Sequence, residues 1–180
     1  RPLVLFGLRA CDVTAIAYQD RFFAGDSWYR ARRECALLVG INCLEACPGG
    51  FCVDVDAGPF ATAGFDLALT ALPDGSVAAE IGSAAGRAAL ATAGFAGSGA
   101  DAATGGALAA AVQRAVSSFP ARPFIARARA RLDAEGGRAA IGAAEWQALG
   151  PWCLACTGCT SLCPTCSCFI VVDEPRGSGG

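Results

Sequence analysis

The chain has 180 residues, a formal net charge of −2 and 54% hydrophobic residues, and it contains no His, no Lys and no Met. Without histidine, Ser-His-Asp and Cys-His catalysis are excluded, and without lysine so are Schiff-base chemistry and the Walker A phosphate loop. The balanced charge argues against a nucleic-acid partner, and no apolar run has the length of a membrane span. Eleven cysteines without a secretory signal favour thiolate-bound metal in a reducing, cytoplasmic compartment.

The first half of the sequence predicts an α/β domain over residues 1–95, with a parallel or mixed sheet and flanking helices. The apolar runs Leu3–Leu8 and Ala36–Ile41 are typical of buried strands, and the second has the continuous apolar character of a parallel strand. Between them, Asp12 is expected to cap a helix that ends near Phe23.

A hairpin, a linker and a second module follow in the sequence. The turn Pro73-Asp74-Gly75 separates two apolar runs, at 65–72 and 77–81, and Ser83 is expected to begin a helix that ends near residue 93. The segment 96–142 is rich in Ala and Gly and predicts a linker with helices at 107–118 and 124–135. The segment 143–180 predicts a short helix at 143–149, a cysteine-rich loop and a strand at 169–172. The sequence opens without Met on a strand-like run and ends in Gly and Ser, so we expect a chain truncated at both ends.

The cysteine-rich loop is the most informative segment of the sequence. Cys153, Cys156, Cys159 and Cys163, followed by Pro164, have the spacing C-x2-C-x2-C-x3-C-P, which binds a [4Fe-4S] cluster in bacterial ferredoxins, where the fourth Cys ligates the neighbouring cluster. Structural zinc normally pairs two C-x2-C knuckles across a longer spacer, and disulfides need an oxidising compartment. Cys166 and, less strongly, Cys168 are further candidates to ligate or tune a cluster.

A second group of cysteines lies in the predicted α/β domain. Cys11 follows a strand and begins a helix, where the helix dipole is expected to favour the thiolate. Cys43 follows the next strand, and the carboxyl ends of neighbouring parallel strands share one edge of the sheet. Cys11 and Cys43, with Cys47 and Cys52 on the following loop, therefore form a candidate site for an additional cluster. Ordinary buried cysteines and a zinc site are the alternatives, and Cys35 is expected to lie in the core.

The cysteine groups and several stretches between them resemble a known family, the iron–sulfur beta subunit of cytoplasmic NAD(P)-linked [NiFe] hydrogenases, or sulfhydrogenases. The sequence is also similar to the electron-transfer subunit of anaerobic sulfite reductase, which shares the same dicluster domain. The matching stretches are FGLRACD (6–12), YRARRE (29–34), LLVGINC (37–43), FC (51–52), GPFATAGFDLALT (58–70) and CLACTGCTSLCPTCSC (153–168).

The resemblance implies a subunit that carries electrons and has no catalytic residue of its own. FAD and NAD(P) are expected on a partner subunit, and the [NiFe] small and large subunits complete a hetero-oligomer. Cys153, Cys156, Cys159 and Cys163 match the first ligand run of the family. The family also has a second such run downstream, which is absent here, and it often has Cys at the position of Gly50.

We therefore expect an α/β domain followed by a ferredoxin-like [4Fe-4S] module, acting as a one-electron relay between the [NiFe] subunits and a flavin/NAD(P) subunit. An electron-transfer subunit of anaerobic sulfite reductase is the alternative within the same class. A zinc-stabilised scaffold and a sensor with a labile cluster are the alternatives from other classes.

Overall fold

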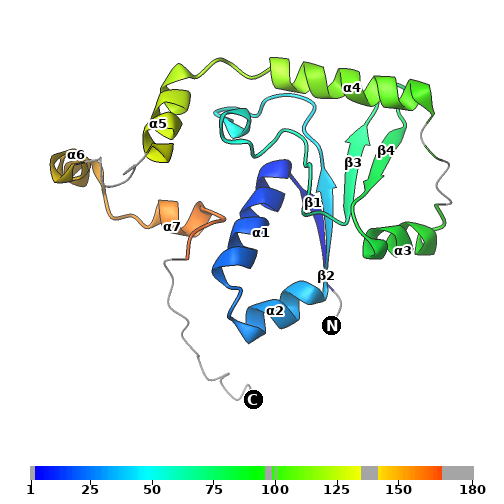
Figure 1. Cartoon of the computed structure of the whole chain (residues 1–180), viewed down its shortest axis with the longest axis horizontal. Helices are drawn as coiled ribbons and strands as arrows, with labels where there is room; N and C mark the ends of the chain where they lie inside the picture. Colours follow the sequence, from blue (N-terminus) through cyan, green and yellow to red (C-terminus); the bar gives the residue numbers. More distant parts are fainter. Residues whose placement is uncertain (1–2, 96–98, 100, 135–141, 168–180) are drawn as a thin grey trace, which may run out of the picture. The chain divides into compact units, whose positions relative to one another are not determined.

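The computed structural model describes residues 3–95, 99, 101–134 and 142–167, and the chain divides into two compact units, 1–140 and 141–180 (Figure 1). The first unit is built on a four-stranded sheet with the order β1-β2-β3-β4. Its elements are β1 (Leu3–Leu8), α1 (Ala10–Phe22), α2 (Ser27–Glu34), β2 (Ala36–Ile41), the 3-10 helix η1 (Cys52–Val55), β3 (Leu67–Ala71), β4 (Val77–Ile81), α3 (Ala84–Thr92), α4 (Ala102–Ser117) and α5 (Pro123–Asp133).

The sheet is mixed. Strands β1 and β2 run parallel, with Leu5 opposite Leu38, and β2 and β3 also run parallel, with Val39 opposite Leu67. Strands β3 and β4 form an antiparallel hairpin around the turn at 73–75. The predicted α/β domain and its strands are therefore confirmed, and the carboxyl ends of β1, β2 and β3 lie at one edge of the sheet.

The core lies between the sheet, α1 and the loop before β3. Ala10 and Val13 on α1 pack with Phe65 and Ala68, and Leu8 joins this cluster from the end of β1. Leu38, in the middle of β2, is completely buried. Burial of a leucine side chain stabilises a fold by about 1.5–3 kcal/mol. The start of α1 is thus fixed to the sheet at its carboxyl edge.

Strand β1 differs from its prediction as a buried strand. The side chains of Leu3, Val4 and Phe6 are 47%, 57% and 67% exposed. The reason is strand order: β1 pairs only with β2 and forms the edge of the sheet among the described residues. The apolar sequence alone does not distinguish an edge strand from a central one.

Helix α1 also begins earlier than predicted. Arg9 is its N-cap residue, and Asp12 lies at the third helical position. The Asp12 carboxylate accepts a hydrogen bond from the backbone N–H of Arg9 at 2.8 Å. Asp12 therefore stabilises the helix start from inside the first turn, as the acidic residue of a capping box does, and the prediction of Asp12 as the cap was wrong.

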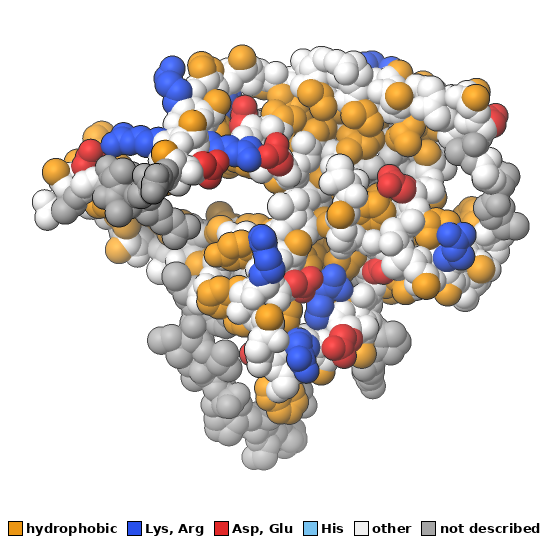
Figure 2. All heavy atoms as spheres, in the orientation of Figure 1, with side chains coloured by type: hydrophobic (Ala, Val, Ile, Leu, Met, Phe, Trp, Pro, Cys, Tyr) orange, Lys and Arg blue, Asp and Glu red, His pale blue; other side chains and the backbone are white. Residues whose placement is uncertain are grey.

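Helix α2 occupies the arginine-rich segment and is capped by Asp26, which accepts hydrogen bonds from Trp28 N and Tyr29 N. The hydroxyl of Tyr29 donates to Asp20 at 2.7 Å, and Arg33 Nε pairs with the same carboxylate at 3.0 Å. Burial, the hydrogen bond to Asp20 and the charge of Asp20 together raise the pKa of Tyr29 to about 12. Over α1 and α2, basic and acidic side chains are interspersed (Figure 2).

Asp20→Asn is expected to lower the pKa of Tyr29 from about 12 toward its ordinary value of 10.0, because the negative charge beside the phenol disappears. A folded-state pKa raised in this way stabilises the fold fully below pH 10, and that stabilisation is lost as the pH rises through about 12. Spectrophotometric titration of tyrosinate checks the shift, with Tyr29→Phe assigning the signal against Tyr18. An unchanged titration in Asp20→Asn would contradict the assigned cause.

Two further helices are positioned by capping side chains. Ser83 caps α3 as predicted: its Oγ accepts from Gly86 N at 3.0 Å and donates to the Asp66 carboxylate. Asp66 also accepts from Leu38 N at 2.7 Å and so connects α3 to β2. Helix α4 begins at Ala102, five residues before its predicted start, because Asp101 accepts from Thr104 N at 2.7 Å.

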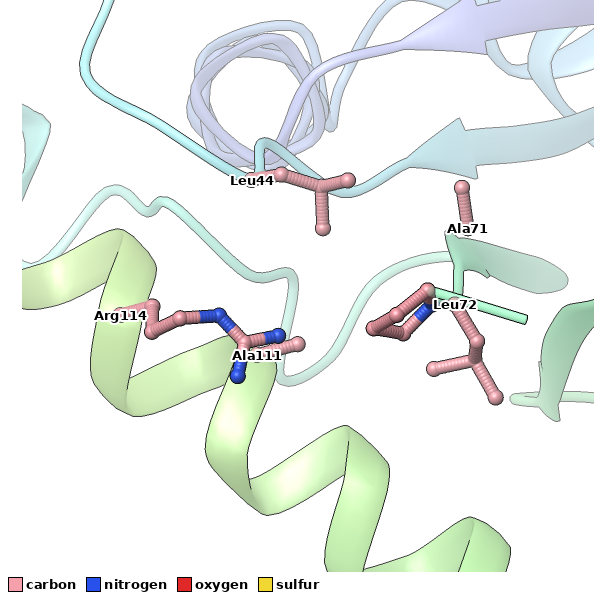
Figure 3. Close-up of a pocket in the computed structure, with 6 residues that line it drawn as sticks. Leu44, Ala71, Leu72, Ala111 and Arg114 are labelled. Atoms are coloured by element: carbon pink, nitrogen blue, oxygen red, sulfur yellow. The ribbon is translucent and has the colours of Figure 1, made fainter. Parts of the chain in front are cut away.

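A small apolar cavity of about 160 Å³ lies between α4 and the carboxyl ends of the strands (Figure 3). Ala111 and Arg114 border it from α4, Leu44 from the loop after β2, and Ala71 and Leu72 from the end of β3. Because Leu44 directly follows Cys43, α4 covers the sheet edge that carries the cysteines.

The second unit contains α6 (Ala143–Leu149), the 3-10 helix η2 (Gly150–Trp152) and α7 (Gly158–Leu162). Helix α6 confirms the prediction for this segment. The predicted strand at 169–172 and Cys168 lie outside the described residues. Within the described part of the chain, no helix has the length and apolar character needed to cross a membrane.

Candidate functional site

Four cysteines of the first unit follow the ends of β1 and β2 along the chain: Cys11 on the first turn of α1, Cys43 after β2, Cys47 on the following loop, and Cys52 at the start of η1. Cys52 and the start of α1 both contact Gly58. A Cβ placed on that glycine would lie 3.1 Å from Cys52 Sγ and 3.3 Å from the Ala10 Cβ. The backbone N–H of Cys43 donates to the Pro59 carbonyl at 3.1 Å in the same region.

The pKa values of Cys11, Cys43 and Cys52 are coupled to the charges of other thiols in this group. Burial raises the pKa of Cys52, and the charges of Cys11, Cys43 and Cys47 raise it further. Burial likewise raises the pKa of Cys43, and the charge of Cys47 adds to this. Strands β1 and β2 are parallel, so the strand ends that precede Cys11 and Cys43 lie at one edge of the sheet as predicted. Whether the four cysteines share one site stays a prediction.

The pKa of Cys11 is raised, whereas the sequence predicted that the helix N-terminus would favour the thiolate. Burial raises it, the neighbouring Asp12 charge raises it further, and Cys43 contributes in the same direction. These effects outweigh the helix N-terminus, which was expected to favour the thiolate. The Arg9 side chain has the opposite effect on Cys43, whose pKa it lowers through its charge and a hydrogen bond. Arg9 thus places a positive charge close to Cys43.

Asn42 secures the strand end that carries Cys43. It is buried, and its amide nitrogen donates to Thr70 Oγ1 at 3.0 Å while its carbonyl accepts from Ala61 N at 3.0 Å. Buried polar groups need such partners, and here they join β2, β3 and the loop between them. Sequence reasoning missed Asn42, although a polar residue directly after an apolar strand is a usable signal.

The loop that carries Cys47 and Cys52 is held by residues far along the chain. Ser118 Oγ accepts from Ala46 N at 2.8 Å. Arg122 Nη1 donates to the Gly49 carbonyl at 3.2 Å. Arg129 Nη1 donates to the Asp54 carbonyl at 3.2 Å, and its Nη2 pairs with Asp56 at 2.7 Å. The segment 118–129 is thus a clamp on the cysteine loop, which the sequence alone did not reveal.

Cys35 lies apart from this group. It was expected in the core, but its side chain is exposed at the end of α2. The prediction was wrong because Cys35 belongs to the turn between α2 and β2, and burial of β2 begins further along the strand.

The four cysteine thiols of the first unit are the kind of ligand that binds soft metal ions. Four thiols with no histidine are the ligands that iron–sulfur clusters and zinc prefer. Among the described residues, no three Cys, Asp or Glu side chains lie close enough together to hold one metal ion. A tetrahedral zinc site needs sulfurs about 3.8 Å apart, given its Zn–S bonds of about 2.3 Å. A four-iron cube binds each thiolate through a different iron and therefore holds the four sulfurs farther apart than one zinc ion does.

In the second unit the ligand run follows η2. Cys153 ends η2, Cys159 lies on α7, and Cys163 ends α7. Cys156 lies between two non-glycine residues with left-handed backbone, Ala155 (φ 51°) and Thr157 (φ 59°). Such conformations cost about 1–3 kcal/mol each and concentrate at functional sites, so the chain turns sharply around Cys156.

The thiols of this run are accessible. Cys153, Cys156, Cys159 and Cys163 are exposed, and Cys166 is half-buried. Thr165 lies 3.2 Å from Cys163 Sγ, and hydrogen bonding to Thr165 lowers the pKa of Cys163. A lowered pKa favours the thiolate, the form that binds metal. Whether these cysteines ligate a cluster stays a prediction.

The chain is similar to a known protein along most of its length. The sulfhydrogenase 2 subunit beta of Pyrococcus furiosus is 32% identical over 185 residues, which cover 94% of this chain and 49% of that protein. The chain thus spans about half the length of the curated relative it matches. No family model matches the chain, and no solved structure is significantly similar to it. Along nearly its whole length the chain is similar to a sulfhydrogenase beta subunit, which confirms the resemblance drawn from its motifs.

Proposed function

We propose that the chain is the iron–sulfur subunit of a hydrogenase complex and relays single electrons between the [NiFe] subunits and a flavin/NAD(P) subunit. The observation that carries the proposal is the placement of Cys11 and Cys43 after two parallel strands that end at one edge of the sheet, with Cys47 and Cys52 on the loop that follows. The similarity to a sulfhydrogenase beta subunit supports the type of complex.

Two sets of thiolates would hold the clusters. Cys153, Cys156, Cys159 and Cys163 would hold a [4Fe-4S] cluster in a ferredoxin-like module, with Cys166 as a further thiol. The second set is the group of four at the sheet edge of the first unit. Bound there, the clusters would supply one-electron oxidation and reduction.

The protein's own side chains position and tune the site. Arg9 places a positive charge beside Cys43, and this charge favours the thiolate over the thiol. Burial around Cys43 and Cys52 restricts water, and water access is one of the factors that set cluster potentials. The chain has no histidine or lysine for acid–base or Schiff-base chemistry, so bond-making on a substrate belongs to partner subunits, where FAD, NAD(P) and the [NiFe] site would lie.

The decisive experiment is the iron, acid-labile sulfide and zinc content of the anaerobically purified protein, with EPR of the reduced sample. About eight iron and eight sulfide per chain are expected, for two [4Fe-4S] clusters. About four of each, lost when Cys156 is replaced, would leave the first-unit cysteines structural. Zinc without sulfide would overturn the electron-transfer function and favour a zinc-stabilised scaffold. Co-purification with a siroheme subunit would instead favour an electron-transfer subunit of sulfite reductase.

A further inference from the structure

We propose that the outer face of α2, centred on Trp28 and Arg32, is the surface on which a partner subunit docks, and that the partner presents carboxylates beside an apolar pocket. The inference rests on the proposed function in one respect, namely that the chain belongs to a complex of several subunits. It adds the place of contact and the chemistry of the partner surface.

Helix α2 has two sides of different character. Tyr29 and Arg33, which are four residues apart, both contact Asp20 of α1, at 2.7 Å and 3.0 Å. Trp28 and Arg32 are also four residues apart, a spacing that places Cβ atoms about 5–6 Å from each other on one side of a helix. Both of these side chains are exposed. The first pair therefore holds α2 to the fold, and the second pair is presented to solvent.

The exposure of Trp28 is the observation that carries the proposal. Its side chain is 82% exposed, although aromatic side chains bury about 150–250 Å² each in cores and interfaces. Within the part of the chain that the structure describes, the indole thus has little packing role. Tryptophan and arginine are the residue types most enriched among the side chains that carry the binding energy of protein interfaces. A partner pocket that takes up the indole would give it the burial that it lacks in the first unit.

The apolar surface continues from α2 to the end of α1. Phe22 is 55% exposed, and its ring centroid lies 4.8 Å from that of Phe23. Phe23 in turn stacks on Tyr29 of α2, with 5.2 Å between the ring centroids. The aromatic side chains therefore link the two helices, which is consistent with an interface larger than one residue.

The charge of Arg32 determines which kind of partner fits. Arg33 already pairs with Asp20, and the helical spacing places Arg30 and Glu34 together on the side of α2 opposite Trp28. Among the described residues, no carboxylate pairs with Arg32. A partner carboxylate complements this guanidinium. A two-fold contact between copies of the chain would instead place two faces of the same positive sign against each other.

The face is rigid and lies away from the cysteine loop. Asp26 caps α2 by accepting hydrogen bonds from Trp28 N at 2.8 Å and Tyr29 N at 2.9 Å, so the anchor is ordered before it binds. Helix α1 begins at the carboxyl edge of the sheet, and its 13 residues span about 20 Å before α2 follows. A partner on α2 would thus hold the complex together without contacting the cysteine loop.

The test uses the full chain and, as the probe, the partner subunits separated from the native complex at high salt and then recombined with it. Trp28→Ala is expected to weaken their affinity by about 30-fold, as truncation of a central interface residue does. Arg32→Glu is expected to slow association roughly tenfold at low salt and less at high salt, because it reverses the charge that attracts the partner.

Each variant has a matched control on the first unit. Arg30→Glu makes the same charge change on the opposite side of α2, and Phe95→Ala removes another aromatic side chain, one that is 68% exposed. Both should leave the affinity unchanged. In the unmodified complex, hydroxyl-radical footprinting should find Trp28 protected relative to the isolated chain, a readout that does not depend on any variant.

The outcomes separate this inference from the proposed function. Unchanged affinity of Trp28→Ala, or equal oxidation of Trp28 in the complex and in the isolated chain, would overturn the docking face and leave the relay intact. A dimer of the isolated chain that Trp28→Ala dissociates would assign the face to a second copy, and loss of binding to anionic lipid vesicles in this variant would assign it to a membrane; either result overturns the proposal. Iron, sulfide and EPR signals should be the same in Trp28→Ala and the unmodified chain. Zinc in place of iron would overturn the relay, whereas the affinities would still decide the docking face.

Discussion

Cys156→Ala is expected to remove the C-terminal cluster and to stop electron transfer through the complex. Cys156 lies between two left-handed residues in a sharply turned loop, so neighbouring cysteines cannot shift into its place without rebuilding the turn. Loss of a residue that only supports a metal ligand typically costs about 10–100-fold in metal affinity or activity, and loss of the ligand itself should cost more. Iron and sulfide should fall by about half, since one of two clusters is lost.

The loss is measured by the rates of electron transfer to a physiological and to an artificial acceptor, together with EPR of the clusters. Ser161→Ala is the control, because Ser161 lies exposed on α7, within the same cysteine run, and carries no thiol. Normal iron content and normal electron transfer in Cys156→Ala would contradict the assignment of this run as a cluster site.

Gly86→Ala is expected to destabilise the first unit by about 2–4 kcal/mol, although alanine favours helix formation over glycine by about 1 kcal/mol. Gly86 is in the first turn of α3, which packs directly on the backbone before β3. A Cβ on this residue would lie 2.0 Å from the Asp66 carbonyl oxygen and 2.7 Å from its carbon. The same Asp66 carbonyl accepts a hydrogen bond from Gly82 N at 2.9 Å, so it cannot move away freely.

Urea denaturation of the full chain, followed by circular dichroism, measures the change in the free energy of unfolding. Gly105→Ala in α4 is the matched control, because nothing lies within 4 Å of a Cβ placed there. It should stabilise the chain by about 0.5–1 kcal/mol through helix propensity alone. The two substitutions should therefore have opposite signs, and a stabilising Gly86→Ala would show that α3 does not pack as described.

Local signals predicted most of the first unit. The apolar run of β2, the turn at 73–75 and the Ser83 cap each depend on a few neighbouring residues, and each is present in the structure. That Cys11 and Cys43 both follow strand ends at one edge of the sheet was predicted from one topological rule, that parallel strands end at the same edge.

What the sequence could not predict depends on contacts between distant residues. The exposure of β1 depends on strand order, and the raised pKa of Cys11 depends on what buries it. The hydrogen bonds of Asn42 and the clamp at 118–129 connect positions that no local pattern relates. The cluster-ligand role of every cysteine remains a prediction that iron analysis will decide.

The clamp at 118–129 is translated well after the cysteine loop that it holds. The residues that hold the cysteine loop follow it by 72, 73 and 75 positions in the chain. At translation rates of about 5–20 residues per second, the loop therefore emerges roughly 4–15 s before its last partner is made. During this interval the thiols of Cys43, Cys47 and Cys52 stand on an unsecured segment of the nascent chain. A cluster bound by the first unit would therefore find its loop fully held only after α5 has been synthesised.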